Sequence, residues 1–208
     1  MDAVFFDRAP DLVAPELIGA VLVSTAGGVE TGGRIVETEA YLGSDDAGSH
    51  AATHGVTKRN AVMYGPPGSA YVYFTYGNHH MINLVCEREG VAGAVLIRAL
   101  EPLLGIEVMT ERRRGLPIKD LCSGPGKLTA ALGIDLADNG SLLGRGRLSV
   151  YYGERPSQGE IARSGRIGLS SGHELELRWY LEKSAYVSRG RVGPVVRGVR
   201  RPTKEGQG

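Results

Sequence analysis

The pattern of apolar and polar positions is most regular in residues 34–42 (RIVETEAYL), where it follows a period of two. That period is typical of a strand and places Glu37, Glu39 and Tyr41 on one face, with Thr38 on the other. Two further apolar runs flank a short GNHH turn, which is the pattern of a β-hairpin. These segments predict a sheet in which one strand carries acidic side chains on a single face.

The remaining segments predict a few helices and many short strands. Helical patterns occupy residues 5–19, 103–114 and 124–134. Strands are expected at AVLVST (20–25), AYVYFTY (70–76), MINLVCE (81–87), AVLIRALEP (94–102), RLSVYY (147–152), RIGLSS (166–171), ELELRWYLE (174–182) and AYVSR (185–189). No repeat or long linker divides the chain. We therefore expect one α+β domain over residues 1–208, built on antiparallel sheet, with a poorly ordered tail at 194–208.

Composition narrows the class of protein without naming a function. The 208 residues are 42% apolar and 23% charged, which is ordinary for one globular domain. No run approaches the roughly 20 apolar residues of a membrane span, and the acidic start lacks the pattern of a secretory signal. Cys86 and Cys122 are too few for a disulfide scaffold and lack zinc-site spacing. We therefore expect a reduced, cytoplasmic setting.

Charge is nearly balanced overall, at +1, but it is unevenly distributed. Residues 1–50 hold nine acids and two bases, whereas residues 178–208 hold eight bases and two acids. This asymmetry permits an anionic partner on one face of the molecule. A solvated basic tail without a partner is the alternative.

Two charged residues in predicted strands are candidates for chemistry. Glu39 shares its face with Tyr41 and is a candidate general base, although a solvated acid on an open sheet face, as Glu37 could be, explains it as well. Arg98 lies in an apolar strand where burial is expected, so its guanidinium needs an anionic or carbonyl partner. Glu39 could be that partner, and so could Glu101 or Glu107 in a purely structural ion pair.

Tyrosine is concentrated in a short stretch of the chain. Five of the nine tyrosines lie within 36 residues, at Tyr41, Tyr64, Tyr71, Tyr73 and Tyr76. Tyrosine rings stack on nucleobases, which makes a nucleic-acid partner one explanation. Ordinary strand preference is the other, and it explains Tyr71 and Tyr73 better than Tyr76, which is at the expected hairpin end.

Metal and phosphate motifs are weak. His50 and His54 are four residues apart, but the segment lacks an HExxH pattern and a third ligand. SGPGKLT is not a P-loop, because the required first glycine falls at Leu121. We therefore expect no metal and no cofactor.

Several long strings in the chain are similar to one family, the alkyladenine (3-methyladenine) DNA glycosylases. The similarity is collinear from about Leu17 to about Arg189 and is carried by RIVETEAYLGSDDAGSH, TKRNAVMYGPPGSAYVYFTYG, INLVC, AVLIRALEPLLG, LCSGPGKLTAALGI and RIGL. It implies a curved antiparallel sheet with flanking helices and a protruding β-hairpin that enters the minor groove of DNA. It also implies a monomeric enzyme that acts on damaged purines in double-stranded DNA.

The resemblance further implies roles for individual residues. Glu39 matches the general base that activates water, Arg98 an arginine that helps hold that water, and the backbone carbonyl of Ile167 a third water contact. Four residues match the pocket for the flipped base: Tyr41, His50, Tyr73 and Asn83. Of these, Asn83 matches an asparagine that disfavours guanine. Tyr76 matches the residue that fills the space vacated in the duplex. Asn78, His79 and His80 depart from the family pattern at the hairpin tip.

These roles imply a monofunctional glycosylase that flips alkylated or deaminated purines and hydrolyses the N-glycosidic bond, which starts base excision repair. Two rival functions are a non-catalytic lesion- or RNA-binding module and a metal-dependent hydrolase that uses His50 and His54. A binding module has no need of both Glu39 and Arg98, and a metal enzyme would be inhibited by a chelator.

Overall fold

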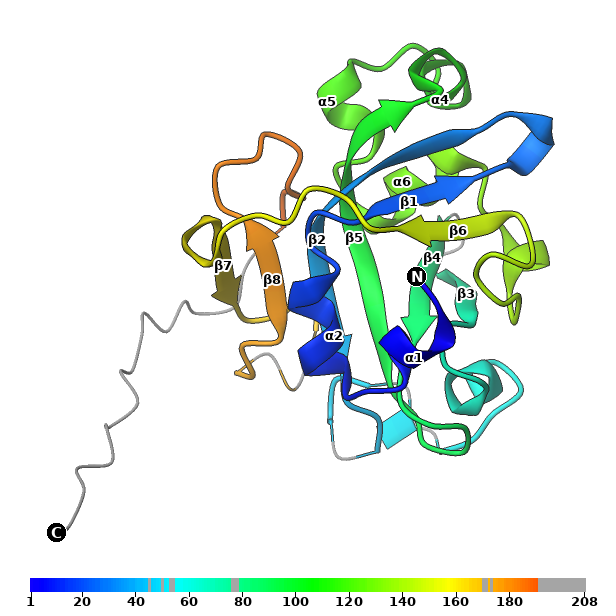
Figure 1. Cartoon of the computed structure of the whole chain (residues 1–208), viewed down its shortest axis with the longest axis vertical. Coiled ribbons are helices and arrows are strands. Elements are labelled where there is room, and N and C mark those ends of the chain that lie inside the picture. The colour runs from blue at the N-terminus through cyan, green and yellow to red at the C-terminus, as the bar shows by residue number, and fades with distance from the viewer. Residues whose placement is uncertain are drawn as a thin grey trace, which may run out of the picture.

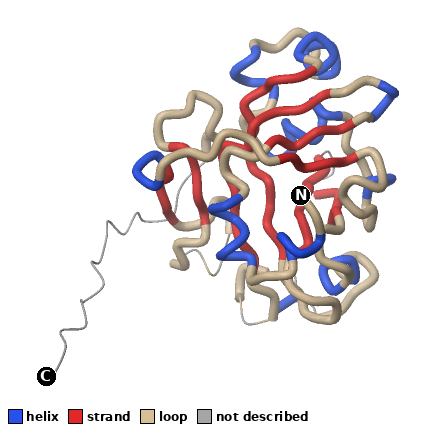
Figure 2. Tube along the Cα trace, in the orientation of Figure 1, coloured by secondary structure: helices blue, strands red, loops and turns tan. Residues whose placement is uncertain are grey.

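The computed structural model describes residues 1–44, 46–49, 51–52, 55–75, 79–169, 172 and 174–190. They form a single α+β domain in which helices flank a curled antiparallel sheet (Figures 1 and 2). The strands are β1 (Val21–Ser24), β2 (Thr31–Tyr41), β3 (Ala70–Thr75), β4 (His79–Val85), β5 (Ala94–Leu104), β6 (Leu148–Tyr151), β7 (Ile161–Ser164) and β8 (Arg178–Leu181). The helices are α1 (Ala3–Phe6), α2 (Pro10–Glu16), α4 (Ile106–Arg112), α5 (Ile118–Leu121) and α6 (Pro125–Leu132), with single 3₁₀ turns at Ala26–Gly28, Ala61–Tyr64, Leu136–Asp138 and Gln158–Glu160.

Strand β2 is the centre of the sheet, whose order is β3-β4-β5-β2-β1-β6. One edge of β2 pairs with β5 along most of its length. Its other edge pairs first with β1, over residues 31–34, and then with β8, over residues 37–39. Strand β7 pairs with β8 and extends that side. Residues 37–39 of β2 therefore lie between a strand from the middle of the chain and one from near its end.

Helices α2 and α6 pack mainly against different strands of the sheet. Helix α2 packs on one face, where the Thr38 hydroxyl donates a hydrogen bond of 3.0 Å to the carbonyl of Ala14. Helix α6 packs against β4 and β5. Apolar side chains from the sheet and both helices form the main core, which includes Val13, Leu17, Ile82, Leu84, Val95, Ile97, Leu128 and Leu132. Burial of that apolar surface favours the arrangement.

Helix α6 confirms the helix expected at 124–134, and its ends follow from the sequence. Pro125 occupies the first turn, where a missing N–H costs nothing, and Gly133 follows the last turn with φ of 68°. That left-handed conformation suits glycine and lets its N–H bond to the carbonyl of Thr129. The Thr129 hydroxyl bonds the carbonyl of His80 at 2.8 Å, which ties α6 to β4.

The predicted hairpin is confirmed by the antiparallel pairing of β3 with β4, in which Tyr73 lies opposite Met81. Strand β4 begins at His79, within the segment expected to turn. The residues between the two strands, which include Tyr76, lie outside the described residues. The helix expected at 103–114 begins only at Ile106, because β5 continues to Leu104 and Gly105 turns the chain with φ of 64°.

Two predicted strands are wrong, and in both cases side chains take the backbone N–H groups. No strand forms over residues 166–169, where the N–H of Ile167 donates to the carboxylate of Glu39. None forms over residues 185–189, where the N–H of Ser188 donates to Glu37. Strand β7, in contrast, forms where the sequence pattern predicts none.

Candidate active site

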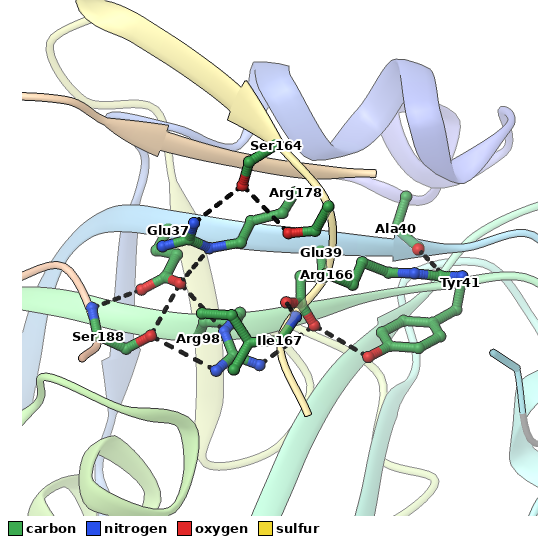
Figure 3. A network of polar contacts seen from close by, with 11 residues as sticks. Glu37, Glu39, Ala40, Tyr41, Arg98, Ser164, Arg166, Ile167, Arg178 and Ser188 are labelled. Carbon is green, nitrogen blue, oxygen red and sulfur yellow. Dashed lines mark hydrogen bonds and ion pairs between the residues drawn. The ribbon is translucent and has the colours of Figure 1, made fainter. Parts of the chain in front are cut away.

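The acidic face predicted for β2 exists, and it is buried. Glu37 and Glu39 are both fully inaccessible to solvent. They project from the face opposite Thr38, toward Arg98 of β5, as Figure 3 shows. Glu37 is therefore not the solvated acid that the sequence allowed. Two buried carboxylates on one strand require compensating charge and hydrogen bonds.

Glu39 is fixed by three donors from three parts of the chain (Figure 3). Its Oε2 accepts hydrogen bonds from Arg98 Nη1 at 3.1 Å and from the Tyr41 hydroxyl at 2.9 Å. Its Oε1 accepts one from the backbone N–H of Ile167 at 2.7 Å. The pairing of Arg98 with Glu39, left open by the sequence, is thereby confirmed.

Arg98 is shared between both carboxylates of β2. Its Nε donates to Glu37 Oε1 at 3.1 Å while Nη1 binds Glu39, and its Nη2 lies 3.4 Å from the hydroxyl oxygen of Ser188. The structural alternative with Glu101 is wrong, since that carboxylate pairs with Arg34 at 3.7 Å. Three nitrogens with three different acceptors hold the planar guanidinium in one orientation.

Glu37 is also bound by residues from the end of the chain. Arg178 of β8 donates through Nε to Glu37 Oε1 at 2.7 Å and through Nη1 to the hydroxyl oxygen of Ser164 of β7 at 3.0 Å. Ser188 donates to Glu37 through both its N–H, at 2.6 Å, and its hydroxyl, at 2.8 Å. Two carboxylates and two guanidinium groups thus form a neutral buried network.

The network sets the protonation of two of its members. Burial alone would lower the pKa of Arg98, but the carboxylates of Glu39 and Glu37 outweigh it and raise that pKa. Burial, reinforced by the nearby charge of Glu39, raises the pKa of Tyr41 well above its usual value. Arg98 therefore stays charged, and the Tyr41 phenol keeps the proton that it donates to Glu39.

A pocket of about 270 Å³ opens beside this network. Arg98 and Ile167 line it, and so do three of the four residues expected to form its walls: Tyr41, Tyr73 and Asn83. The remaining lining residues are Gly48, Met63, Tyr71, Thr75, Met81, Leu96, Pro125, Gly168 and Leu169. The structure thus brings the expected wall residues to the same place as Arg98. The fourth wall residue, His50, lies outside the described residues, as does Tyr76.

The Tyr41 wall is supported from behind by a fully buried arginine, Arg166. Its guanidinium carbon lies 4.7 Å from the centre of the Tyr41 ring. It pairs with both oxygens of Asp46, at 2.6 Å for Nη2 and Oδ1, and donates to the carbonyls of Ala40 and Gly172. Arg166 therefore ties the loop after β2 to the segment that carries Ile167.

Another part of the pocket wall is built on β3. The rings of Tyr71 and Tyr73 are neighbours, 5.2 Å apart between centres, as their shared strand face predicts. The guanidinium carbon of Arg59 lies 4.9 Å from the Tyr73 ring centre. Asn83 lies opposite Tyr71 on β4 and donates its amide N–H to the Tyr71 carbonyl at 3.2 Å, which fixes the orientation of that amide.

Five residues of this site are not among those that the sequence predicts: Asp46, Ser164, Arg166, Arg178 and Ser188. Arg166 and Arg178 each lie among apolar residues in RIGL and LRWYL, which is the signal that identified Arg98. The two serines and the aspartate carry no such signal, because short polar residues are common in loops.

The described residues offer neither a metal-binding cluster nor a membrane-spanning helix. They include no group of three or more histidine, cysteine, aspartate or glutamate side chains placed to hold a metal ion. His50 and His54, the metal candidates from the sequence, lie outside those residues. None of the helices in the described part of the chain has the length and apolar character needed to cross a bilayer.

Comparison with known proteins identifies the class. Residues 4–185 match the model of the family described as methylpurine-DNA glycosylase (MPG). Since the match spans most of the 208 residues, the chain belongs to the methylpurine-DNA glycosylase family.

Individual relatives agree with the family. A protein of Chlorobaculum parvum is 49% identical over 193 residues, which cover 90% of each chain. One of Chlorobium luteolum is 47% identical over 188 residues, 89% of this chain and 95% of the relative. One of Methanoculleus marisnigri is 46% identical over 192 residues, 91% and 98% of the two chains. All three bear the name "Putative 3-methyladenine DNA glycosylase". The protein is a DNA glycosylase, so DNA is its substrate, and the resemblance drawn from the sequence is confirmed.

Proposed function

We propose that the protein is a monofunctional glycosylase that extrudes alkylated or deaminated purines from duplex DNA and releases them with a water activated by Glu39. The observation that carries this proposal is the contact of a buried carboxylate, Glu39, with Arg98 and Tyr41 at the wall of the pocket. The product is an abasic site, the first intermediate of base excision repair.

The buried position of Glu39 requires that the base leave the helix. A base stacked in duplex DNA cannot enter a pocket, so the enzyme extrudes it at a cost of a few kcal/mol, which is lower for damaged bases. Tyr41 and Tyr73 offer aromatic walls to the extruded purine. Tyr76, which lies between β3 and β4 in the sequence, fills the vacated space in this proposal, as the family resemblance implies.

Hydrolysis uses a hydrogen-bond acceptor lone pair of the Glu39 carboxylate. Each carboxylate oxygen has two lone pairs, and Oε1 accepts one hydrogen bond from the described residues, that of the Ile167 N–H. In the proposed step the groups that bury Glu39 shift to admit a water from the pocket to Oε1. This water gives a proton to Glu39 as its oxygen attacks C1′ of the sugar, while the bond from C1′ to the base breaks and its electron pair leaves with the base. The negative charge of Glu39 also stabilises the positive charge that develops on the sugar.

In this proposal Arg98 helps to hold the water, because its guanidinium lines the pocket and binds Glu39.

The charge of the base and the pocket walls determine which bases react. A cationic purine such as N3-methyladenine leaves as a neutral base and needs no additional proton. The aromatic faces of Tyr41 and Tyr73 favour such cations. Asn83 disfavours normal guanine by crowding its 2-amino group.

The decisive experiment replaces Glu39 with glutamine and measures base release under single-turnover conditions from a duplex that carries one N7-methylguanine, with alkaline cleavage of the abasic product. We expect Glu39→Gln to lower the rate by at least about 10²-fold, because a general base typically contributes on this scale. Binding of the lesion duplex should persist.

The matched control is Glu101→Gln, which removes a partly exposed carboxylate of β5 that pairs with Arg34. We expect wild-type base release from this control. A rate for Glu39→Gln close to that of Glu101→Gln would show that Glu39 is not the base.

A further inference from the structure

The hydroxyl of Ser188 closes a ring of hydrogen bonds around Arg98 (Figure 3). It accepts from Arg98 Nη2 at 3.4 Å and donates to Glu37 Oε1 at 2.8 Å. The same Oε1 accepts from Arg98 Nε at 3.1 Å. The ring therefore joins two nitrogens of one guanidinium through a single serine hydroxyl and a single carboxylate oxygen.

This ring uses the side of Arg98 that does not contact Glu39. Nη1 alone binds Glu39, at 3.1 Å, whereas Nε and Nη2 belong to the ring. Because the guanidinium is rigid and planar, fixing two of its nitrogens fixes the direction of the third. Ser188 and Glu37 therefore determine where Nη1 lies relative to Glu39 and the pocket.

We propose that Ser188 is a positioning residue for base release, acting through Arg98, and that the segment after β8 thereby completes the active site. The inference rests on the proposed function, in which Glu39 and Arg98 hold the attacking water. Ser188 itself does not line the pocket, so it contacts neither base nor water in this account. Its effect is on the position of Arg98. Small displacements of catalytic groups reduce rates strongly, so a shift of Arg98 is enough to slow base release.

The position of Ser188 separates this role from a role in folding. The residue is partly exposed and lies beyond the last strand of the sheet. Truncation to alanine removes the hydroxyl but keeps the backbone N–H that donates to Glu37 Oε2 at 2.6 Å. The change therefore leaves Glu37 with donors from Arg98, Arg178 and the backbone.

The test compares Ser188→Ala with Ser184→Ala, a serine of the same segment whose hydroxyl oxygen accepts from the N–H of Tyr186. Both are assayed for single-turnover base release from a duplex bearing one N7-methylguanine, for affinity toward that duplex, and for thermal unfolding. We expect Ser188→Ala to release the base about tenfold more slowly, the scale of a hydrogen bond to a charged group. Affinity and melting temperature should match those of Ser184→Ala.

A double-mutant cycle with Arg98→Lys identifies the route of the effect. If Ser188 acts through Arg98, then adding Ser188→Ala to Arg98→Lys lowers the rate no further, and Ser188→Thr, which keeps the hydroxyl, stays near wild type. Equal rates for Ser188→Ala and Ser184→Ala, or an undiminished tenfold loss in the Arg98→Lys background, would overturn the inference.

The outcome for Glu39→Gln distinguishes this inference from the function on which it depends. Wild-type base release by Glu39→Gln removes the proposed function and the positioning role together. An inactive Glu39→Gln combined with a wild-type Ser188→Ala removes the positioning role alone.

Discussion

Tyr41 combines two tasks in one side chain. Its ring forms a wall of the pocket and lies against the guanidinium of Arg166, while its hydroxyl donates to Glu39. Because burial and the charge of Glu39 raise its pKa, the phenol remains a donor at neutral and moderately alkaline pH. The orientation of the carboxylate therefore does not depend on pH through this residue.

Replacing Tyr41 with phenylalanine isolates the hydroxyl from the ring. We expect Tyr41→Phe to slow base release by up to about tenfold, because Glu39 loses one charge-assisted hydrogen bond while the wall of the pocket remains. The measurement is single-turnover release from a methylated duplex. Tyr151→Phe, on an exposed tyrosine of β6, is the control. A Tyr41→Phe enzyme as fast as this control would show that the hydroxyl has no part in the chemistry.

At the scale of elements, the site depends on a connection between two irregular segments. Arg166 and Asp46 join the segment before Ile167 to the loop after β2, and both side chains are almost fully buried. Burial would raise the pKa of Asp46, but its hydrogen bonds with Arg166 outweigh burial and lower that pKa. A lowered pKa means that the ion pair stabilises the fold above the usual pKa of aspartate and loses that effect as the pH falls through the lowered value.

Asp46→Asn should therefore destabilise the protein most at neutral pH. Removing one partner of a buried ion pair leaves an uncompensated charge, which typically costs about 3–5 kcal/mol. We expect that loss in urea unfolding at pH 7, and a smaller difference from wild type at pH values below the usual pKa of aspartate, where the stabilisation by the ion pair is progressively lost. Glu154→Gln, which breaks an exposed pair with Arg34, should cost less than about 1 kcal/mol. Equal losses in the two variants would contradict this account.

The elements show where sequence patterns succeed and where they fail. Alternation predicts the common face of Glu37, Glu39 and Tyr41 correctly, because β2 keeps a period of two over residues 37–41. The same alternation places Ile35 on that face, but the pairing with β5 shifts register between Ile35 and Glu37, and Ile35 lies in the apolar core. The strands predicted at 166–169 and 185–189 do not form, because an apolar pattern does not reveal that distant carboxylates take the backbone N–H groups. The choice between Glu39 and Glu101 as partner of Arg98 also required the pairing of strands, which no local pattern contains.

At the scale of the whole molecule, part of the charge asymmetry along the chain proves to be internal. Three of the nine acids in residues 1–50 are buried and pair with arginines far along the chain: Glu37 and Glu39 with Arg98, Glu37 with Arg178, and Asp46 with Arg166. The excess of bases after residue 50 therefore serves the site as well as the surface. The sequence pattern alone could not separate these two uses.

DNA binding should nevertheless depend on salt. Phosphate contacts from exposed lysine and arginine release counterions, so the logarithm of the binding constant should fall linearly with the logarithm of salt concentration, with a slope of about −0.9 for each phosphate neutralised. The measurement is the affinity of Glu39→Gln for a lesion duplex at several salt concentrations. An affinity independent of salt would contradict binding through the phosphate backbone.

The ring around Arg98 joins Glu37, in the first fifth of the chain, to Ser188, in its last tenth. During synthesis on the ribosome, the central strands can therefore associate long before the enzyme becomes competent. A copy cut by a protease after Leu181 would retain the eight strands of the described sheet yet lose this serine. On the role proposed for Ser188, nicking at that point yields a folded enzyme that releases bases more slowly.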